Sequence, residues 1–287
     1  MDTDRTPVVV GTDGSAEADR AVRQAAREAS WRGLPLRVVH AFIWPLFNVP
    51  LDPPKLGPPG GGLRNQANRI VKRAVDLARA QAPGIEVTGA VVDGAAQAVM
   101  VGEVRAAEML VLGSRGLGGF SGLLLGSVAM EVTPHATCPV LVVRGEPVLR
   151  GPVVVGVDGS PHGGAALAFA LAEAGWRQVA VRAVHAYGPV DGHGGDEPDR
   201  AESRLLAESV TRCYDRHPDV PVEQLTLPGQ PAPILLDAAR DAQLVVVGAR
   251  GRGGFAGLLL GSVSHSLLHH APCPVAVVRQ PMDKPAA

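Results

Sequence analysis

The feature that most constrains the fold of this chain is that its sequence repeats itself once. Val8–Ser15 reads VVVGTDGS and Val153–Ser160 reads VVVGVDGS, identical at seven of eight positions. Residues 109–144 and 244–279 align at an offset of 135, with 22 of 36 positions identical. A repeat of about 140 residues has the size of a domain rather than of a solenoid unit. We therefore predict two domains of one kind, at 1–147 and 148–287, joined by the polar segment RGEPVLRGP at 144–152.

Both copies alternate short apolar runs with longer stretches of helical periodicity. The apolar runs of the second copy, for example, are expected as strands at 153–157, 179–187, 222–227, 244–248 and 275–279. Strands that are almost wholly apolar and alternate with helices are typical of parallel sheets covered on both faces. We predict an α/β fold of two tandem, open, doubly wound (Rossmann-like) five-stranded parallel sheets. The final strands, Val140–Arg144 and Val275–Arg279, are edges that need a partner, and antiparallel pairing between them would supply it.

Composition excludes several classes of protein. The 287 residues carry 27 Lys plus Arg against 28 Asp plus Glu, a net charge of −1, without the basic surplus of a nucleic-acid-binding protein. Three cysteines lack C-x-x-C spacing, Met1–Pro7 does not read as a signal peptide, and no apolar run approaches the length of a membrane span. We expect a cytoplasmic protein that binds neither nucleic acid nor membrane.

The strongest local motif is a glycine-rich segment that follows the fourth strand of each copy. It reads GSRGLGGFSGLLLGS at 113–127 and GARGRGGFAGLLLGS at 248–262. Glycines allow the backbone to approach a ligand closely, and the amides of a following helix N-terminus bind anions. The segment lacks the lysine of a Walker A loop and the third glycine of the dinucleotide fingerprint. A glycine-lined crossover that holds no ligand remains the alternative.

With both motifs in view, the chain resembles a tandem member of the universal stress protein family, over essentially its whole length. The ATP-binding branch of that family carries G-x2-G-x9-G-[ST], matched here by Gly113, Gly116, Gly126 and Ser127, and by Gly248, Gly251, Gly261 and Ser262. The resemblance implies one ATP per domain, bound with Mg²⁺. It further implies an Asp after the first strand in contact with the nucleotide, and a second-strand valine whose backbone lies near the adenine. It also implies pairing of the final strands, which makes the two halves an intramolecular pseudo-dimer; whether the chain forms a homodimer as well stays open.

The candidate binding residues are the loop positions together with the matched strand ends. In the first domain they are Gly11, Asp13, Val39, Gly113, Ser114, Arg115, Gly116, Gly118, Gly119, Gly126, Ser127 and Val128. In the second they are Gly156, Asp158, Val184, Gly248, Ala249, Arg250, Gly251, Gly253, Gly254, Gly261, Ser262 and Val263. Each Asp could instead form an Asx turn or cap a helix, and each Arg could be a solvated loop charge.

The sequence gives little support for a metal site or for catalysis. His265 and His269 are spaced i, i+4, but the segment is HSLLHH and the first copy has Met130 and Pro134 there, so we predict no metal site. We also predict no catalytic residues, because neither loop has a lysine or a second carboxylate nearby.

The sequence thus favours an ATP-binding regulatory stress-response protein, in which nucleotide occupancy acts as a sensor or switch read by an unknown downstream protein. Two alternatives stay open: a nucleotide-free structural or chaperone-like stress protein, and a slow ATPase.

Overall fold

The computed structural model describes residues 5–43, 61–117, 125–145, 148, 150–188, 196–214, 216–252 and 259–280. The chain divides into two compact units, Met1–Val132 and Thr133–Ala287. Most of the Pro/Gly-rich segment at 44–62 lies outside the described residues. This division does not test the domain boundary that we predict between residues 147 and 148, which stays a prediction.

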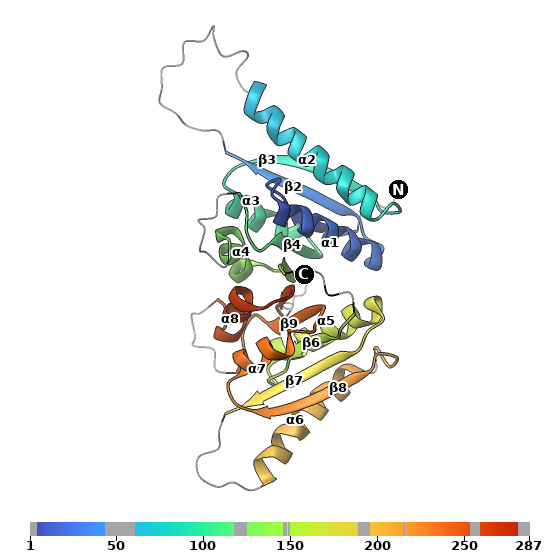
Figure 1. Cartoon of the computed structure of the whole chain (residues 1–287), viewed down its shortest axis with the longest axis vertical. Helices are drawn as coiled ribbons and strands as arrows, with labels where there is room; N and C mark the ends of the chain where they lie inside the picture. Colours follow the sequence, from blue (N-terminus) through green and yellow to red (C-terminus); the bar gives the residue numbers. More distant parts are fainter. Residues whose placement is uncertain are drawn as a thin grey trace, which may run out of the picture. The chain divides into compact units, whose positions relative to one another are not determined.

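Unit 1 contains four parallel strands in the order β3-β2-β1-β4 (Figure 1). They are β1 (Val8–Gly11), β2 (Leu36–Phe42), β3 (Val87–Asp93) and β4 (Met109–Gly113). Helices α1 (Ala16–Arg32) and α2 (Gly61–Gln81) pack against each other, as do α3 (Ala96–Glu103) and α4 (Ser127–Val132). A single 3₁₀ turn, Val104–Ala106, follows α3.

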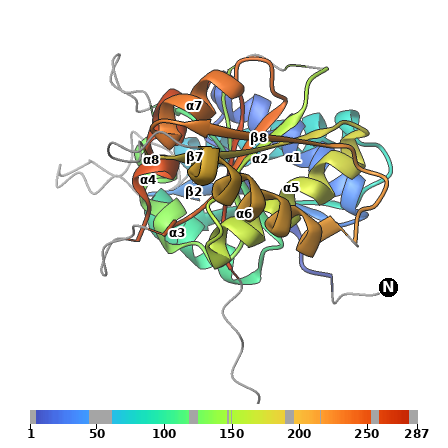
Figure 2. The same ribbon diagram turned by 90° about the horizontal axis from the view of Figure 1, so that it is seen from below.

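Unit 2 contains the equivalent parallel strands in the order β10-β9-β6-β7-β8, with β5 added at the β10 edge. Its strands are β5 (Val140–Val143), β6 (Val153–Gly156), β7 (Val181–Tyr187), β8 (Val222–Pro228), β9 (Leu244–Gly248) and β10 (Val275–Val278). Its helices are α5 (Pro161–Arg177), α6 (Asp196–Tyr214), α7 (Pro231–Ala238) and α8 (Ser262–His270), preceded by a 3₁₀ turn at Thr133–His135. Figure 2 shows α6 and α7 on opposite sides of β7 and β8. The α/β class and the parallel, Rossmann-like sheet that the sequence predicted are confirmed.

The expected antiparallel pairing of the final strands is also confirmed. In β5 and β10, Val142 pairs with Val275, Leu141 with Ala276, and Val140 with Val277. Of the five strands expected in the first copy, four lie in unit 1, whereas β5 belongs to unit 2. The register is reciprocal. Val140 pairs with Val277, and Val275, the repeat equivalent of Val140, pairs with Val142, the repeat equivalent of Val277.

The first helix of each repeat begins at a serine. Ser15 Oγ accepts a hydrogen bond from Ala18 N at 3.1 Å, and Ser160 Oγ accepts one from Gly163 N at 3.0 Å. Such N-caps satisfy one of the free amides of the first turn. α1 ends at Gly33 in the left-handed conformation, and α5 ends at Gln178 in the same conformation, with φ of 57°. The helix caps are therefore the serines, and neither Asp13 nor Asp158 has that role.

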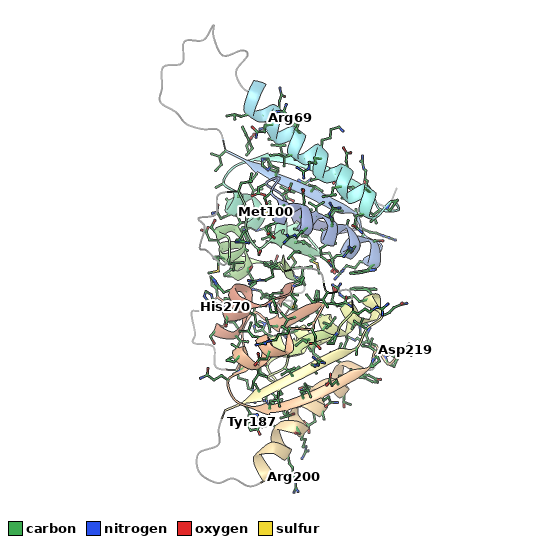
Figure 3. The ribbon with its side chains drawn as sticks, in the orientation of Figure 1. Arg69, Met100, Tyr187, Arg200, Asp219 and His270 are labelled. Carbon is green, nitrogen blue, oxygen red and sulfur yellow. The ribbon has the colours of Figure 1, made fainter. Side chains whose placement is uncertain are left out.

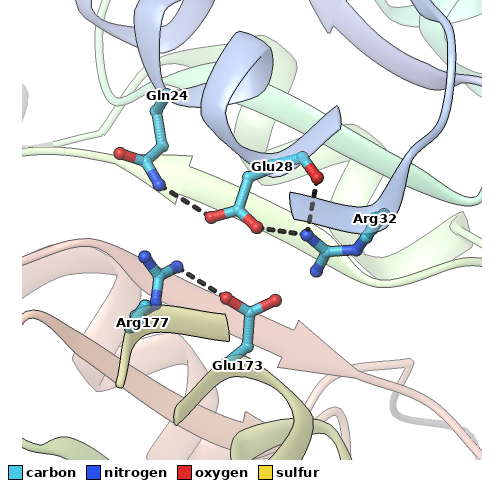
Figure 4. A network of polar contacts seen from close by, with 5 residues as sticks. All are labelled: Gln24, Glu28, Arg32, Glu173 and Arg177. Carbon is cyan, nitrogen blue, oxygen red and sulfur yellow. Dashed lines mark hydrogen bonds and ion pairs between the residues drawn. The ribbon is translucent and has the colours of Figure 1, made fainter. Parts of the chain in front are cut away.

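The same two helices each bury a glutamate at an equivalent position. Glu28 and Glu173 have no exposed surface, and each is paired with the arginine four residues later, Arg32 or Arg177 (Figure 4). Glu28 also accepts a hydrogen bond from Gln24 Nε2 at 2.7 Å. A buried carboxylate is tolerated only when its charge is compensated, which explains why the arginine recurs in both repeats.

We expect the thiol of Cys273 to be unreactive in the folded protein. Cys273 is 1% exposed, and burial raises the pKa of its thiol to about 12. Since only the thiolate reacts, the reactive fraction at pH 8 is on the order of 10⁻⁴. Treatment with iodoacetamide at pH 8 followed by peptide mass spectrometry should leave Cys273 unlabelled in buffer and label it fully in urea. Rapid labelling of Cys273 in buffer would contradict this.

Candidate functional site

A cavity of about 600 Å³ opens in unit 2 at the carboxyl ends of β6, β7 and β9. The chain runs outward from β6 to β7 and β8, and then crosses to the other side of β6 to form β9 and β10. The strand order therefore reverses between β6 and β9, and ligands of open α/β sheets bind at this kind of position. The lining combines strand ends with the glycine-rich loop and with residues of α5, α6, α7 and α8.

Most of the residues predicted for the second domain line this cavity. They are Gly156, Asp158, Val184, Gly248, Arg250, Gly251, Gly261, Ser262 and Val263. Ala249 is fully buried and does not belong to the lining. Gly253 and Gly254 lie outside the described residues, as do Gly118 and Gly119 of the first domain.

The remaining residues predicted for the first domain occupy the corresponding places of unit 1. Gly11 ends β1, Val39 lies in β2, and Gly113 ends β4. Ser114, Arg115 and Gly116 follow β4, while Gly126, Ser127 and Val128 lie at the start of α4. The amide of Gly126 donates to Ser114 O at 2.7 Å, and Gly261 donates to Ala249 O at the same distance in unit 2. The two loops thus close in the same way.

Asp158 joins two segments that are far apart in the chain. Its Oδ1 accepts hydrogen bonds from Ser160 N at 2.9 Å and from Ser160 Oγ at 2.6 Å, which is an Asx turn. Its Oδ2 accepts a hydrogen bond from Arg252 N at 2.9 Å, in the glycine-rich loop. Asp13 repeats this arrangement with Ser15 N at 3.0 Å and Leu117 N at 2.6 Å. The carboxylate expected beside a nucleotide therefore also holds the loop in place.

The glycines of the motif fall into two groups when a Cβ atom is placed on each. On Gly116 and Gly251 it would lie 2.4 and 2.5 Å from Oδ2 of Asp13 and Asp158. On Gly248 the Cβ atom would lie 2.9 Å from the backbone of His162. On Gly113 it would lie 3.1 Å from the backbone of Glu17 in α1. These four glycines are explained by contacts within the protein.

Gly126 and Gly261 form the second group. A Cβ atom at either position would have its nearest neighbours at 3.5 Å, which is ordinary van der Waals contact. Gly261 has φ of −78° and ψ of 159°, a conformation open to any residue. Contacts within the described protein therefore do not require glycine at these positions, and Gly261 faces the cavity.

The N-terminus of α8 forms part of the cavity wall. Its N-cap is Gly261, and no side chain caps the helix. Ser264 is 1% exposed and donates to Ala249 O and Gly261 O, so its hydroxyl fastens the start of α8 to the end of β9. The amides at the start of a helix carry partial positive charge and attract anions. In unit 1 the residue equivalent to Ser264 is Ala129, and α4 has only six residues.

Positive charge gathers at the same end of the cavity. Arg250 lines it, and Arg279 donates to Leu259 O at 2.8 Å. Burial lowers the pKa of His162, as do the charges of Arg250 and Arg279, while Asp158 opposes this shift. Burial, and then Arg250, also lowers the pKa of Arg279. In unit 1, Arg115 instead has a carboxylate, Glu17, 3.9 Å away, at the position equivalent to His162.

The valine expected near an adenine base already uses its backbone carbonyl. Val184 O accepts a hydrogen bond from Val157 N at 2.9 Å, and Val39 O accepts one from Thr12 N at 2.9 Å. A ligand that donated a hydrogen bond to either carbonyl would therefore use the second lone pair of the carbonyl oxygen.

Several lining residues were missed by the sequence reasoning. They are Val157, Gly163, Ala186, Tyr187, Gly188, Glu202, Pro231, Leu235, Val247, Arg252, Leu260 and Ser264. Figure 3 shows Tyr187 at the end of β7. Glu202 is the most informative of these, because Nε2 of His185 lies 2.7 Å from its Oε2. The repeat held a signal for Glu202. Alignment of the two halves places Ala67 at the equivalent position of the first half, so the second half has a carboxylate where the first has a methyl group.

Comparison with known proteins agrees with the fold and with the repeat. The universal stress protein family matches residues 5–144 and again 150–279. Universal stress protein Rv2005c of Mycobacterium tuberculosis is 39% identical over 289 residues, covering 95% of this chain and 97% of that protein. Universal stress protein Rv2623 of the same species is 37% identical, covering 95% and 96%. The crystal structure of a universal stress protein from Archaeoglobus fulgidus superposes with a TM-score of 0.72 at 19% identity, covering 96% of this chain and 99% of that one.

The chain is a tandem member of the universal stress protein family, with two family domains that account for nearly its whole length. Among the described residues, no cluster of three or more His, Cys, Asp or Glu side chains could hold a metal ion. None of the helices in the described part is long and apolar enough to cross a membrane.

The clash at Gly251 leads to a stability prediction. In Gly251→Ala the Cβ atom displaces Asp158 and breaks its hydrogen bond to the Arg252 amide. We expect the free energy of unfolding to fall by about 1–3 kcal/mol, the cost of losing a hydrogen bond to a charged group. Urea denaturation followed by circular dichroism measures this. Gly84→Ala is the matched control, because Gly84 lies in a turn and nothing lies within 4 Å of its added Cβ. Equal stability of the two variants would refute the clash.

Proposed function

We propose that each half of the chain binds one ATP molecule and that nucleotide occupancy is the state that a downstream protein reads. The observation that carries the proposal is the cavity of about 600 Å³ at the topological switch point of unit 2, lined by nine of the twelve residues predicted for the second domain. Small-molecule and cofactor sites have volumes of roughly 300–1,000 Å³ and combine apolar walls with a few polar groups. The family motif, present in both halves, extends the proposal to unit 1.

The phosphates would lie against the start of α8. There the uncapped helix N-terminus, the exposed Ser262 hydroxyl and the Arg250 guanidinium all favour an anion. Mg²⁺ would arrive with the phosphates and shield their charge. Asp158 lines the cavity, and its two carboxylate oxygens already accept hydrogen bonds from the protein. The nucleotide would therefore supply most of the ligands of that cation.

The alternative, a nucleotide-free structural protein, explains part of the same motif. Four glycines have steric reasons that involve the protein alone, and each Asp has a structural role. Gly126 and Gly261 distinguish nucleotide binding from a purely structural motif. The described residues leave room for a Cβ atom at both positions, whereas a ligand phosphate at the start of the helix would leave none. This favours nucleotide binding over a purely structural motif.

The setting that we propose is the cytoplasm, which suits the three cysteines, all of them free thiols. The role is regulatory rather than enzymatic, because the cavity lining contains no lysine that could stabilise a transferring phosphoryl group.

The proposal predicts that purified protein carries nucleotide. Denaturing freshly purified chain and separating the released small molecules by chromatography should give about two ATP per chain. In Gly126→Ala combined with Gly261→Ala, we expect the bound ATP to fall at least tenfold at unchanged thermal stability, because each methyl group occupies the space of a phosphate.

Gly84→Ala is the control for these variants, since its added Cβ meets nothing within 4 Å and Gly84 does not line the cavity. Absence of released nucleotide, together with no binding of added ATP and Mg²⁺, would favour the structural alternative. Release of ADP, with phosphate production that depends on Mg²⁺, would favour the slow ATPase.

A further inference from the structure

The two halves differ at the end of the cavity farthest from α8. In unit 2, His185 is 3% exposed, and its two ring nitrogens contact Val157 O at 2.6 Å and Glu202 Oε2 at 2.7 Å. In unit 1, Nδ1 of His40 contacts Thr12 O at 2.7 Å in the same way. The residue equivalent to Glu202 is Ala67, which is 1% exposed.

The packing of the helices supports this alignment of Glu202 with Ala67. The turn glycine after β1, Gly14, faces Ile70 of α2, and the turn glycine after β6, Gly159, faces Leu205 of α6. Ile70 and Leu205 are 135 positions apart, the same offset that relates Ala67 to Glu202. The glutamate is thus a feature of the second half.

The hydrogen bonds of His185 determine what Glu202 can offer to a ligand. Nδ1 faces a carbonyl oxygen, so it carries a hydrogen. The contact of 2.7 Å between Nε2 and Glu202 Oε2 then needs one further proton, on the imidazole or on the carboxyl group. In either case the second oxygen, Oε1, is a hydrogen-bond acceptor. Among the described residues it has no hydrogen-bond partner, and the Glu202 side chain is 31% exposed.

The position of Glu202 relates it to one part of a bound nucleotide. The phosphate-attracting groups lie at the end of β9 and the start of α8, whereas His185 belongs to β7, two strands away. Two strand spacings amount to about 10 Å, which is comparable to the distance from the phosphates to the far side of a nucleoside. Glu202, Tyr187 and Gly188 line that end of the cavity.

We propose that Glu202 is a specificity-determining residue of the second-half site, where it accepts a hydrogen bond from an N–H or O–H donor of the nucleoside. His185 is a positioning residue that orients the carboxyl group. The inference rests on the proposed nucleotide binding. It makes the two sites of the chain unequal, because the first half has a methyl group in place of the acceptor.

The test is a comparison of nucleotide analogues on the full chain by titration calorimetry. ATP, 2′-deoxy-ATP, 3′-deoxy-ATP and purine-riboside triphosphate differ by one donor each, so they separate a sugar hydroxyl from the base amine. We expect one of the analogues to bind about tenfold more weakly than ATP at one of the two sites. In Glu202→Ala, the affinity for ATP at that site should fall about tenfold. ATP should then bind no more tightly than the analogue that the wild-type chain binds weakly.

Two further variants make the result specific to the acceptor. Glu202→Gln should keep the preference for ATP, because its amide can donate to neutral His185 and still present an oxygen to the ligand. Glu208→Ala removes an exposed glutamate of the same helix, which pairs with Arg204, and should change nothing.

Two results would count against the inference while leaving the proposed function intact. One is ATP binding at both sites with no discrimination among the analogues by the wild-type chain. The other is unchanged selectivity in Glu202→Ala. If Glu202→Ala does not fold, Glu202→Met, which keeps the length of the side chain without a carboxyl oxygen, replaces it and should show the same loss of ATP affinity. Failure of the wild-type chain to bind any of the nucleotides would instead refute the proposed function itself.

Discussion

The glycine-rich loop depends on one carboxylate in each half. Asp158 binds the amide of Ser160 in its own turn and the amide of Arg252, 94 residues further along the chain. Asp13 does the same across 104 residues. Both contacts require a glycine, Gly116 or Gly251, directly beside the carboxylate. The end of the first strand of each half is thereby joined to the first residues that follow the fourth strand. Contacts of this kind, made by the protein alone, preorganise a surface and lower the free-energy cost of ordering it when a ligand binds.

The two copies of the duplicated scaffold differ in the side chains around the glycine-rich segment. Where the first half has Glu17 near Arg115, the second has His162 near Arg250, so the second loop retains more positive charge. Ser264 fastens the start of α8, whereas its counterpart Ala129 cannot. The backbone contacts that close the loop are the same in both halves. Divergence is concentrated in side chains around the loop and the cavity, which changes what a site attracts while the fold is retained.

Much of the fold could be predicted from the sequence for a simple reason. Buried parallel strands are continuous apolar runs, and β9 ends at a glycine, so the strand at 244–248 was predicted with its observed bounds. Nine of twelve second-half candidates line the cavity, because the carboxyl ends of parallel strands meet at one edge. Ala249 was the exception. It follows β9 directly, but it is fully buried and its carbonyl accepts bonds from Gly261 and Ser264.

The sequence by itself determined the duplication, the α/β class, the family and most of the chain segments that line the cavity of unit 2. Repeats, apolar periodicity and motif spacing are local patterns, and each of these conclusions follows from such patterns. Only the tertiary structure showed that Asp158 binds the amide of Arg252 and that His185 contacts Glu202. These are contacts between residues distant in the chain, and their hydrogen-bond distances and the space around a glycine Cβ arise only once the elements have packed.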